Sequence, residues 1–570
     1  MKEFKNKVAL ITGGANGFGK AFAIEAAKRG MKVVLADIDE ADLAGTTAVV
    51  SNLGAEVLPI CADLTLYENV KMTVEKTMAT FGQIDVLFCN AGVVPCGDII
   101  HLPARDWDWT VATNLTSHGY FYREVVPIMI RQKTPAHIMG VASIAGILHG
   151  IGNNATYSAT KHGAVALIED IRSYFRSNNI DYIGTSVYCP GYVQTDLHHC
   201  ERHRPDRFKA PDDPYYKSEY YRESLKRVNI SIATGIPIDS VGPRLFKAIE
   251  DNQMYVLTHP QYIPYIEGRH RGIEADGELP EGGAGNSARD FKGQVALITG
   301  AAHGFGFAFA KEAAKRGMKL ALVDIMGKKL EEVKAYFAKQ NVECMIFEGD
   351  TSLYEDVKAS VEATMKTYGR IDVLFNNAGV APVGTIVNLH PRDLEWTVAV
   401  NLLGQAYYYR EVLPIMIEQG TPANIITTAS IAGLIPGFGR NPAYSATKHA
   451  SVAMSESVWA KLKDLKVDHV TVSIYCPGFV QTNLHNSDDY RPERFAKGDD
   501  PHYQREAYQE GLANLEKCIV TGTPIDSVGP RLFKAMEEGQ KYIITHPQYL
   551  DVIKKRHAEI EADAKREKSL

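Results

Sequence analysis

One long internal repeat constrains the fold of this chain more than any other feature. Three stretches recur: Val8-Ala-Leu-Ile-Thr-Gly13 at 295–300, Tyr157-Ser-Ala-Thr-Lys-His162 at 444–449, and Pro237-Ile-Asp-Ser-Val-Gly-Pro-Arg-Leu-Phe246 at 524–533. The offset is 287 residues at all three places, as from Val8 to Val295, so no insertion or deletion accumulates between the copies. Solenoid repeats have periods of roughly 20–50 residues. Each copy is therefore expected to be a complete domain.

The repeat divides the 570 residues into two large domains, where length alone suggests about three or four of average size. We expect the first domain over residues 1–276 and the second over residues 288–570, the latter with a charged tail from Lys554. Residues 277–287 are rich in glycine, a composition that resists helix and strand. They are expected to form a flexible linker, and the sequence leaves open whether this joint is natural or engineered.

Composition and charge exclude several classes of protein. Hydrophobic residues make up 45% and charged residues 23%, which is typical of a globular chain rather than a disordered or collagen-like one. No apolar run approaches the ~18 residues of a membrane-spanning helix. With a net charge of -6 and no long basic block, the chain is not expected to bind nucleic acid or anionic membranes.

The cysteines and the N-terminus bear on the compartment. The eight cysteines include no C-x-x-C pair and no metal-ligand spacing, so we expect free or buried thiols, no metal site and a reducing compartment. The chain runs from Met1 into a strand pattern without a signal peptide. A cytoplasmic location is therefore expected.

Each copy alternates strand-like and helix-like segments. Val8–Thr12 is short and apolar throughout, as is typical of a parallel strand buried on both faces. The strand-like segments Lys32–Ala36, Val86–Asn90 and Ile138–Ala142 continue the series, and Lys20–Arg29 has the apolar spacing of a helix. Such alternation indicates right-handed βαβ units. The fold class is expected to be α/β, with two Rossmann-like, doubly wound parallel-sheet domains in tandem.

A glycine-rich turn follows the first strand of each copy. It includes Gly13, Asn16, Gly17, Phe18 and Gly19, and in the second copy Gly300, His303, Gly304, Phe305 and Gly306. Glycines permit a tight turn and let the backbone approach a pyrophosphate, and the next helix offers free N–H groups and the positive end of its dipole. The turn therefore predicts a dinucleotide site in each copy, with a plain β–α turn as the alternative.

The second strand points to the kind of dinucleotide. It ends at Asp37, and its copy ends at Asp324. A carboxylate there can accept hydrogen bonds from both hydroxyl groups of an adenosine ribose and would repel a 2′-phosphate. Neither glycine turn carries Arg or Lys between its glycines. NAD is therefore favoured over NADP, with two sites per chain. The other interpretation is that Asp37 caps the next helix, and one side chain can do both.

Tyr157 and Lys161 are four residues apart in an Ala-rich stretch, and Tyr444 and Lys448 repeat them. Residues at this spacing lie on one face of a helix. A free tyrosine has a pKa near ~10, and a lysine cation beside it is expected to lower that pKa. Such a pair can move a proton to or from an alcohol while a cofactor takes hydride. Because Y-x-x-x-K is common by chance, a surface pair on a helix is the alternative for an isolated match.

Further residues accompany this pair in both copies. They are Ser143 and Ser430 after strands, Asn114 and Asn401 after helical segments, and Asn-Ala-Gly at 90–92 and 377–379 where strands end. The combination resembles the short-chain dehydrogenase/reductase family. The resemblance covers nearly all of both copies, because the motifs occur in the same order twice.

The resemblance implies a role for each matched residue. Tyr157 would be the general acid or base, Lys161 would lower its pKa and hold the nicotinamide ribose, and Ser143 would stabilise charge on the substrate oxygen. Asn114 would hold a water in a proton relay to Lys161. The second copy would repeat these roles with Tyr444, Lys448, Ser430 and Asn401. Further implied cofactor contacts are Asp63, Leu64, Asn90, Ala91, Gly92, Pro190, Gly191, Val193 and Thr195, and in the second copy Asp350, Thr351, Asn377, Ala378, Gly379, Pro477, Gly478, Val480 and Thr482.

The copies differ in two segments that the resemblance assigns to the substrate pocket. The loop between Ser143 and Tyr157 diverges from its copy, and the segment His198–Ala233 diverges from His485–Val520. We expect two active sites with related but non-identical substrate preference, and neutral drift in loops is the alternative. Two dehydrogenases of opposite stereopreference would together perform a net epimerisation of an alcohol.

The expected activity is the interconversion of a secondary alcohol and a ketone with NAD. A dinucleotide-sensing scaffold, or an active copy joined to a structural one, would be expected to lose the Tyr or the Lys, and neither copy has lost them. Within the family, the overall pattern resembles hydroxysteroid and aryl-alcohol dehydrogenases, and the small apolar residues Val93, Val94 and Ile147 fit a bulky apolar secondary alcohol. This resemblance makes a hydroxysteroid the first hypothesis for the substrate. Short polyols and hydroxyacyl thioesters are the alternatives.

Members of this family usually associate through two long helices. The matching segments, near Trp107–Arg131 and Tyr157–Ser177, have apolar positions suitable for burial. An intramolecular pseudo-dimer is therefore expected, and two chains would give a set of four domains.

Overall fold

The computed structural model describes residues 1–150, 154–278, 290–437 and 441–566. Within these ranges it contains two seven-stranded parallel sheets, with the strand orders β3-β2-β1-β4-β5-β6-β7 and β10-β9-β8-β11-β12-β13-β14. In each sheet the order reverses beside the first strand, as it does in a doubly wound fold. The expected fold class is confirmed, and the two copies are called the first half and the second half below.

The strands have the following bounds. The first sheet consists of β1 (Val8–Thr12), β2 (Lys32–Asp37), β3 (Val57–Cys61), β4 (Val86–Cys89), β5 (Ala136–Val141), β6 (Ile183–Tyr188) and β7 (Tyr255–Val256). The second consists of β8 (Val295–Thr299), β9 (Lys319–Asp324), β10 (Cys344–Glu348), β11 (Val373–Asn376), β12 (Ala423–Thr428), β13 (Val470–Cys476) and β14 (Tyr542–Ile544). Every residue of β1 is buried, which accounts for its unbroken apolar sequence. The expected strand at 86–90 ends at Cys89, because the Asn90 amide donates to the Thr12 hydroxyl instead of continuing the ladder.

Helices cover both faces of each sheet. Those of the first half are α1 (Gly17–Lys28), α2 (Glu40–Asn52), α3 (Tyr67–Phe81), α4 (Ala104–Val111), α5 (Ser117–Gln132), α6 (Ala155–Ser177), α7 (Glu219–Ala233), α8 (Val241–Asp251) and α9 (Ile263–Glu278). Those of the second half are α10 (Gly304–Lys315), α11 (Gly327–Ala338), α12 (Tyr354–Tyr368), α13 (Pro391–Val398), α14 (Gln405–Gln419), α15 (Pro442–Asp464), α16 (Glu506–Val520), α17 (Val528–Glu537) and α18 (Leu550–Arg566). In the first half, α1, α2 and α8 share one core with the sheet, and α3, α5 and α6 share the core of the other face.

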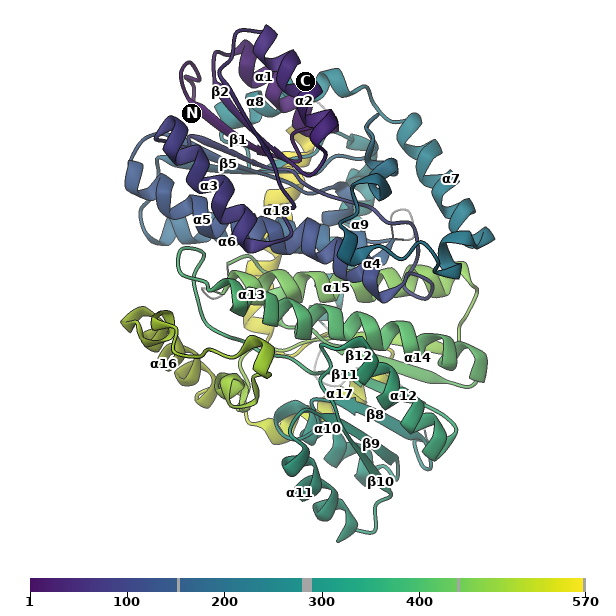
Figure 1. Ribbon diagram of the computed structural model, residues 1–570. Coiled ribbons are helices and arrows are strands. Elements are labelled where there is room, and N and C mark those ends of the chain that lie inside the picture. Colours follow the sequence, from purple (N-terminus) through teal and green to yellow (C-terminus); the bar gives the residue numbers. More distant parts are fainter. Residues whose placement is uncertain (151–153, 279–289, 438–440, 567–570) are drawn as a thin grey trace.

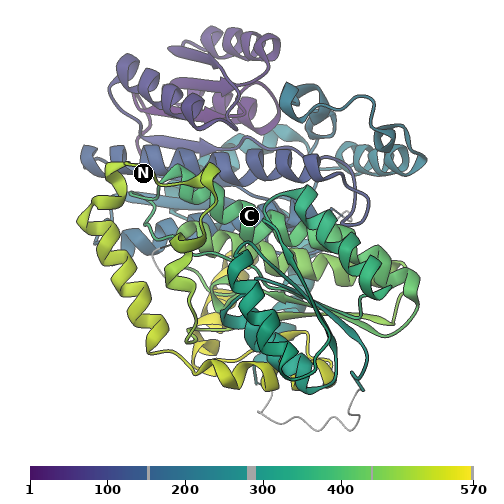
Figure 2. The same ribbon diagram turned by 60° about the horizontal axis from the view of Figure 1, so that its bottom comes forward.

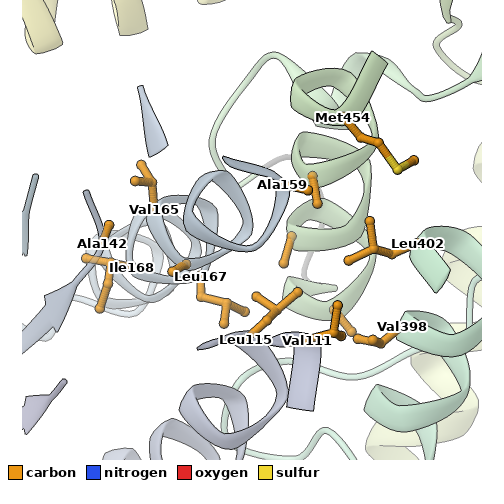
Figure 3. Close-up of a cluster of buried hydrophobic side chains, with 14 of the residues drawn as sticks. Val111, Leu115, Ala142, Ala159, Val165, Leu167, Ile168, Val398, Leu402 and Met454 are labelled. Atoms are coloured by element: carbon orange, nitrogen blue, oxygen red, sulfur yellow. The ribbon is translucent and has the colours of Figure 1, made fainter. Parts of the chain in front are cut away.

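The two halves pack against each other through α6 and α15, which lie side by side between the two sheets (Figure 1). A Cβ atom on Gly163 would lie 3.2 Å from the Ala446 carbonyl oxygen, so the helices approach closely at this glycine. Figure 3 shows Val111 and Leu115 of the first half beside Val398 and Leu402 of the second half, within one buried cluster. The halves are therefore paired within the chain through the helices that the sequence indicated.

The last helix of each half crosses to the other half. The first residue of α9, Ile263, packs in the core of the first half, and Ile273 farther along the helix packs in the core of the second half. Asp276 on α9 accepts a hydrogen bond from the Tyr542 amide in β14 at 2.8 Å. Asp563 on α18 likewise accepts one from the Tyr255 amide in β7 at 2.9 Å. Each sheet is thus completed at its edge by a helix of the other half.

Helices occupy the ends of both expected domains. α9 extends to Glu278, two residues into the expected linker, because Gly277 packs near Leu550 and Glu278 pairs with Lys554 at 2.6 Å. The expected charged tail from Lys554 is mostly part of α18, where Ile560 is buried against the first half. Packing between the halves outweighs the low helix propensity of glycine and the charged composition. The rest of the expected linker, residues 279–287, lies outside the described residues.

Of the helices in the described ranges, none combines the length and the apolar character that crossing a membrane requires.

Candidate functional site

The glycine-rich turn between β1 and α1 forms one end of a cavity of about 180 Å³ in the first half. Gly13 and Gly17 have φ angles of 62° and 51°, which side chains rarely tolerate. A Cβ on Gly19 would lie 1.9 Å from the Gly13 carbonyl oxygen, so only glycine fits where the helix begins. The second half repeats the turn with Gly300, Gly304 and Gly306, beside a cavity of about 770 Å³. The backbone is therefore open toward the cavity at the N-terminus of each helix, as phosphate binding requires.

Asp37 lies at the rim of the first cavity, where β2 ends. Its carboxylate accepts hydrogen bonds from the amides of Ala15 at 2.9 Å and Asp39 at 3.1 Å. Burial raises the pKa of Asp37. Asp39, rather than Asp37, caps the N-terminus of α2, so the capping interpretation of Asp37 is wrong. Asp324 has the same position in the second half and accepts from the Ala302 amide at 2.9 Å.

The ends of β1 and β4 are tied together beside the turn. Asn90 donates from its amide side chain to the Thr12 carbonyl at 3.0 Å, and Thr12 in turn accepts the Asn90 and Ala91 amides through its hydroxyl. Asn377 and Thr299 repeat this arrangement in the second half. The Asn-Ala-Gly segments therefore hold the strand ends that line both cavities.

Asn114 follows the helix α4, as expected, and stands in a π-helical turn, Ala112–Thr116, between α4 and α5. Its side chain both accepts from the Val93 amide at 2.7 Å and donates to the Val93 carbonyl at 2.9 Å. A Cβ on Gly92 would lie 3.3 Å from Lys161 Nζ and 3.5 Å from Asn114 Oδ1, so both groups surround this glycine. The π turn brings the Asn114 side chain to the backbone of Val93, and π turns occur frequently at functional sites. Asn401 lies in the equivalent turn.

Tyr157 and Lys161 lie at the start of α6 and face the cavity. Asn154 caps the helix by accepting from the Tyr157 amide at 2.9 Å, which fixes where the helix begins. Lys161 Nζ donates to the Val141 carbonyl at 3.1 Å and lies 5.5 Å from the centre of the Tyr157 ring. Ser143 follows β5 and is buried beside the Pro190 carbonyl.

The pKa values of the Tyr–Lys pair differ from the expectation. Burial raises the pKa of Tyr157 to about 12, although hydrogen bonding with Ser143 acts in the opposite direction. Burial lowers the pKa of Lys161 to about 8. The expected lowering of the tyrosine pKa by the lysine is therefore wrong in this structure, because desolvation of the buried phenol dominates. Burial likewise raises the pKa of Tyr444 to about 12 and lowers that of Lys448 to about 7.

Most of the predicted site residues line the two cavities. In the first half these are Gly13, Asn16, Gly17, Phe18, Asp37, Asp63, Leu64, Asn90, Ala91, Gly92, Tyr157, Lys161 and Thr195. In the second half they are Gly300, His303, Gly304, Phe305, Asp324, Asp350, Thr351, Asn377, Ala378, Gly379, Ser430, Tyr444, Lys448, Pro477, Gly478, Val480 and Thr482. The predicted residues that line neither of these two cavities are Gly19, Asn114, Ser143, Pro190, Gly191, Val193, Gly306 and Asn401. Gly19, Gly306 and the two asparagines lie behind the lining residues, whereas Ser143 and the Pro-Gly turn fall outside the much smaller first cavity.

A family profile described as short chain dehydrogenase matches this chain twice, over residues 7–206 and 294–492. The chain belongs to the short-chain dehydrogenase family. Both matched regions contain the glycine turn, the Asn-Ala-Gly segment and the Tyr–Lys pair described above.

Individual relatives match one half or both. A CLA biosynthesis dehydrogenase/reductase of Lactiplantibacillus plantarum is 47% identical over 277 residues, which is 49% of this chain and 96% of that protein. A peroxisomal hydratase-dehydrogenase-epimerase of Neurospora crassa is 24% identical over 486 residues, or 80% of this chain, but this stretch is 52% of that longer protein. The solved C-domain of a bacterial malonyl-CoA reductase with NADP covers 95% of this chain and 99% of that chain, at 16% sequence identity and a TM-score of 0.62. This last likeness shows the fold of the two halves taken together.

Sequence reasoning missed a histidine that supports the Pro-Gly turn of this short-chain dehydrogenase. His259 accepts from the Gly191 amide at 2.9 Å, and His546 makes the same contact with Gly478. Thr-His-Pro-Gln-Tyr stands at both places in the sequence, which was an available signal. Sequence reasoning also missed Ser177, a residue of the first half that lines the second cavity. No pattern within one copy could indicate that residue, because its position depends on how the halves pair.

Three side chains of the first half bring potential metal-ligand atoms within 4.8 Å of one another, namely Asp196, His198 and His199. Arg202 already pairs with the Asp196 carboxylate at 2.5 Å, and His199 lies 2.6 Å from it. The group therefore has the character of a partly exposed ion-pair cluster.

Proposed function

We propose that each half is an NAD-dependent dehydrogenase that interconverts a secondary alcohol and a ketone. The observation that carries this proposal is the placement of the Tyr–Lys pair in the same cavity as the glycine turn and the acidic end of the second strand, in each half. The end of each cavity with the glycine turn can hold a dinucleotide, and the end with the Tyr–Lys pair can move a proton. A dinucleotide-sensing scaffold would need only the first end.

The residues present fit a nicotinamide dinucleotide. The glycine turn and the N-terminus of α1 would hold its pyrophosphate, and Asp37 would hold its adenosine ribose. When bound, the nicotinamide ring supplies hydride transfer. The half-buried carboxylate of Asp37 and the buried one of Asp324 would repel a 2′-phosphate, which supports NAD over NADP at both sites.

Tyr157 is the proton donor and acceptor in this proposal. Because burial raises its pKa to about 12, the phenol is protonated at neutral pH and ready to donate to a ketone oxygen. In the oxidation direction it must first lose that proton, and Lys161 is the nearby cation that stabilises the phenolate. Ser143 would hold the substrate oxygen and Asn114 would support the proton path behind Gly92. Tyr444, Lys448, Ser430 and Asn401 take the same roles in the second half.

The second cavity supports a bulky apolar alcohol as the substrate. It is larger than the first, and its lining beyond the cofactor end includes Val383, Leu484, Leu515 and Ile519. A hydroxysteroid remains the first hypothesis, and a hydroxyacyl compound is the alternative. Net epimerisation by two sites of opposite stereopreference is a second candidate function, supported by the match of both halves to relatives named hydratase-dehydrogenase-epimerase.

Separate removal of the two phenols tests the proposal. NADH absorbance is followed with a panel of secondary alcohols for Tyr157→Phe, Tyr444→Phe and the double variant, with exposed Tyr265→Phe as the matched control. Each single variant should lose turnover at its own site by roughly 10²–10⁴-fold, and the double variant should lose it at both. Wild-type turnover in the double variant would refute the proposal.

A further inference from the structure

The two cavities differ in size although their catalytic residues match. The first has a volume of about 180 Å³ and the second about 770 Å³. Helix α16 lines the second cavity through Ala507, Gly511, Leu515 and neighbouring residues. The equivalent helix of the first half is α7, and none of its described residues lines the first cavity. Helices α7 and α16 lie on opposite sides of the molecule, each against its own half (Figures 1 and 2). Helix α16 therefore lines its cavity directly, whereas α7 packs against the segment Leu197–His203, which lines the first cavity.

Tyr220 holds α7 to the loop after β4. Its hydroxyl donates to Asp98 Oδ2 at 2.6 Å, and its ring stacks on the His101 ring at a centroid distance of 4.1 Å. Residue Ala507 has the equivalent position on α16 and can form no such hydrogen bond. Thr385 has the position of Asp98, and its hydroxyl donates to Asn388 at 2.9 Å within its own loop. The contact that holds α7 is therefore absent from its counterpart in the described second half.

The carboxylate that Tyr220 binds depends on a cation from the other half. Lys461 on α15 reaches across the interface and places Nζ 2.6 Å from Asp98 Oδ2, and the exposed fractions of the two side chains are 13% and 3%. His101 contacts the other carboxylate oxygen at 2.7 Å. Burial alone would raise the pKa of Asp98, but hydrogen bonds from His101, Lys461 and Tyr220 hold it well below its usual range. Lys461 therefore supplies this buried carboxylate with a cation from the other half.

The described first half makes no equivalent ion pair with the second half. Lys461 corresponds to Tyr174 in the first half, which offers no cation to Thr385. The second half therefore supports α7 through Lys461, whereas the described residue of the first half at the equivalent position, Tyr174, gives Thr385 no such ion pair.

We propose that Lys461 is a positioning residue for the substrate site of the first half. By holding Asp98, it fixes Tyr220 and α7, which packs against the segment Leu197–His203 that lines the first cavity, so the first half selects a more compact secondary alcohol than the second half. The proposal rests on dehydrogenase activity in both halves, and it makes the first site complete only when the second half is present.

Kinetics of the first site alone test the selectivity. Tyr444→Phe serves as the parent, so that turnover reports the first site, and cyclohexanol is compared with a 3-hydroxysteroid. Lys461→Met and, separately, Tyr220→Ala should each shift the ratio of kcat/KM values toward the steroid by about tenfold, through KM rather than kcat. Lys461→Arg should restore the ratio of the parent. Lys463→Met removes an exposed charge from the same helix and is the matched control. An unchanged ratio in both test variants would overturn the proposal.

Hydrogen exchange provides a readout that needs no turnover. In the Tyr444→Phe parent, amides of residues 219–233 should exchange at least about tenfold faster after Lys461→Met than after Lys463→Met, because α7 loses its anchor. Equal exchange would overturn the positioning role even if no alcohol is oxidised. A parent that turns over neither alcohol but shows the exchange difference would instead refute the proposed dehydrogenase activity of the first half.

Discussion

Replacing Arg556 with methionine removes the cation from an ion pair that joins the two halves. Arg556 lies on α18, and its Nε is 2.9 Å from Oε1 of Glu169 on α6. The exposed fractions of the two side chains are 4% and 1%, so water does not screen the pair. Tyr255 donates a second hydrogen bond to the same oxygen at 2.7 Å. Because α6 also carries Tyr157, this pair connects the other half to the helix of the Tyr–Lys pair.

The expected loss follows from the charge that would be left behind. Removing one partner of a buried ion pair costs about 3–5 kcal/mol, because the other charge stays buried without compensation. We expect Arg556→Met to lower the free energy of unfolding by that amount. Adding Glu169→Gln removes the unpaired charge, and the amide oxygen can still accept from Tyr255. The double variant should therefore regain about 1–3 kcal/mol of the loss.

Urea unfolding, followed by circular dichroism and tryptophan fluorescence, measures these differences. The comparison is made at the same cooperative transition in every variant, since chains of two domains need not unfold in one step. Lys329→Met, which breaks an exposed pair with Glu332, is the control and should change stability by less than about 1 kcal/mol. Arg269→Met removes the equivalent buried cation beside Glu456 and should repeat the large loss. A loss below about 1 kcal/mol in Arg556→Met, or no recovery in the double variant, would refute the reasoning.

Two further predictions concern the cofactor and the interface. Asp37→Ser in the Tyr444→Phe parent should lower the preference for NAD over NADP at the first site by about tenfold, because the carboxylate that repels a 2′-phosphate is lost. The ratio of the kcat/KM values for the two cofactors measures this preference. An unchanged ratio would contradict the prediction. Burial raises the pKa of Asp170 from 3.8 to about 7, so stability is lost as the pH rises from about 4 through 7, by about 4 kcal/mol in total. Asp170→Asn should therefore stabilise the protein most at a pH of about 8 and least at about 4, and urea midpoints that differ equally at both pH values would contradict this.

Local patterns in the sequence were sufficient for the sheets and for the cofactor end. The short run Val8–Thr12, followed by a glycine-rich turn, is typical of a strand buried on both faces, and β1 has those bounds. Position 19 requires glycine, because a Cβ atom there would lie 1.9 Å from the Gly13 carbonyl oxygen. These features depend on neighbours within a few residues or on steric rules that hold in any context, so the sequence alone predicts them.

Features that depend on the pairing of the halves could not be predicted. The crossing of α9 and α18 depends on which sheet edge each amphipathic helix meets, and neither helix sequence specifies its partner. The Lys461–Asp98 contact joins residues whose neighbourhood exists only after the halves have packed. The raised pKa of Tyr157 has a similar origin, because the balance between desolvation and the lysine charge depends on burial and on a distance of 5.5 Å. Sequence spacing brings Tyr157 and Lys161 to one helix face but fixes neither quantity.

The central claim is that one chain carries two complete nicotinamide-dinucleotide sites, each in its own half. Calorimetric titration of the chain with NADH tests it most directly, because it counts sites without any knowledge of the substrate. We predict two NADH molecules per chain, and one per chain after Gly19→Val, which fills the first cradle where a Cβ would lie 1.9 Å from the Gly13 oxygen. A stoichiometry of one or none in the unmodified chain would contradict the account.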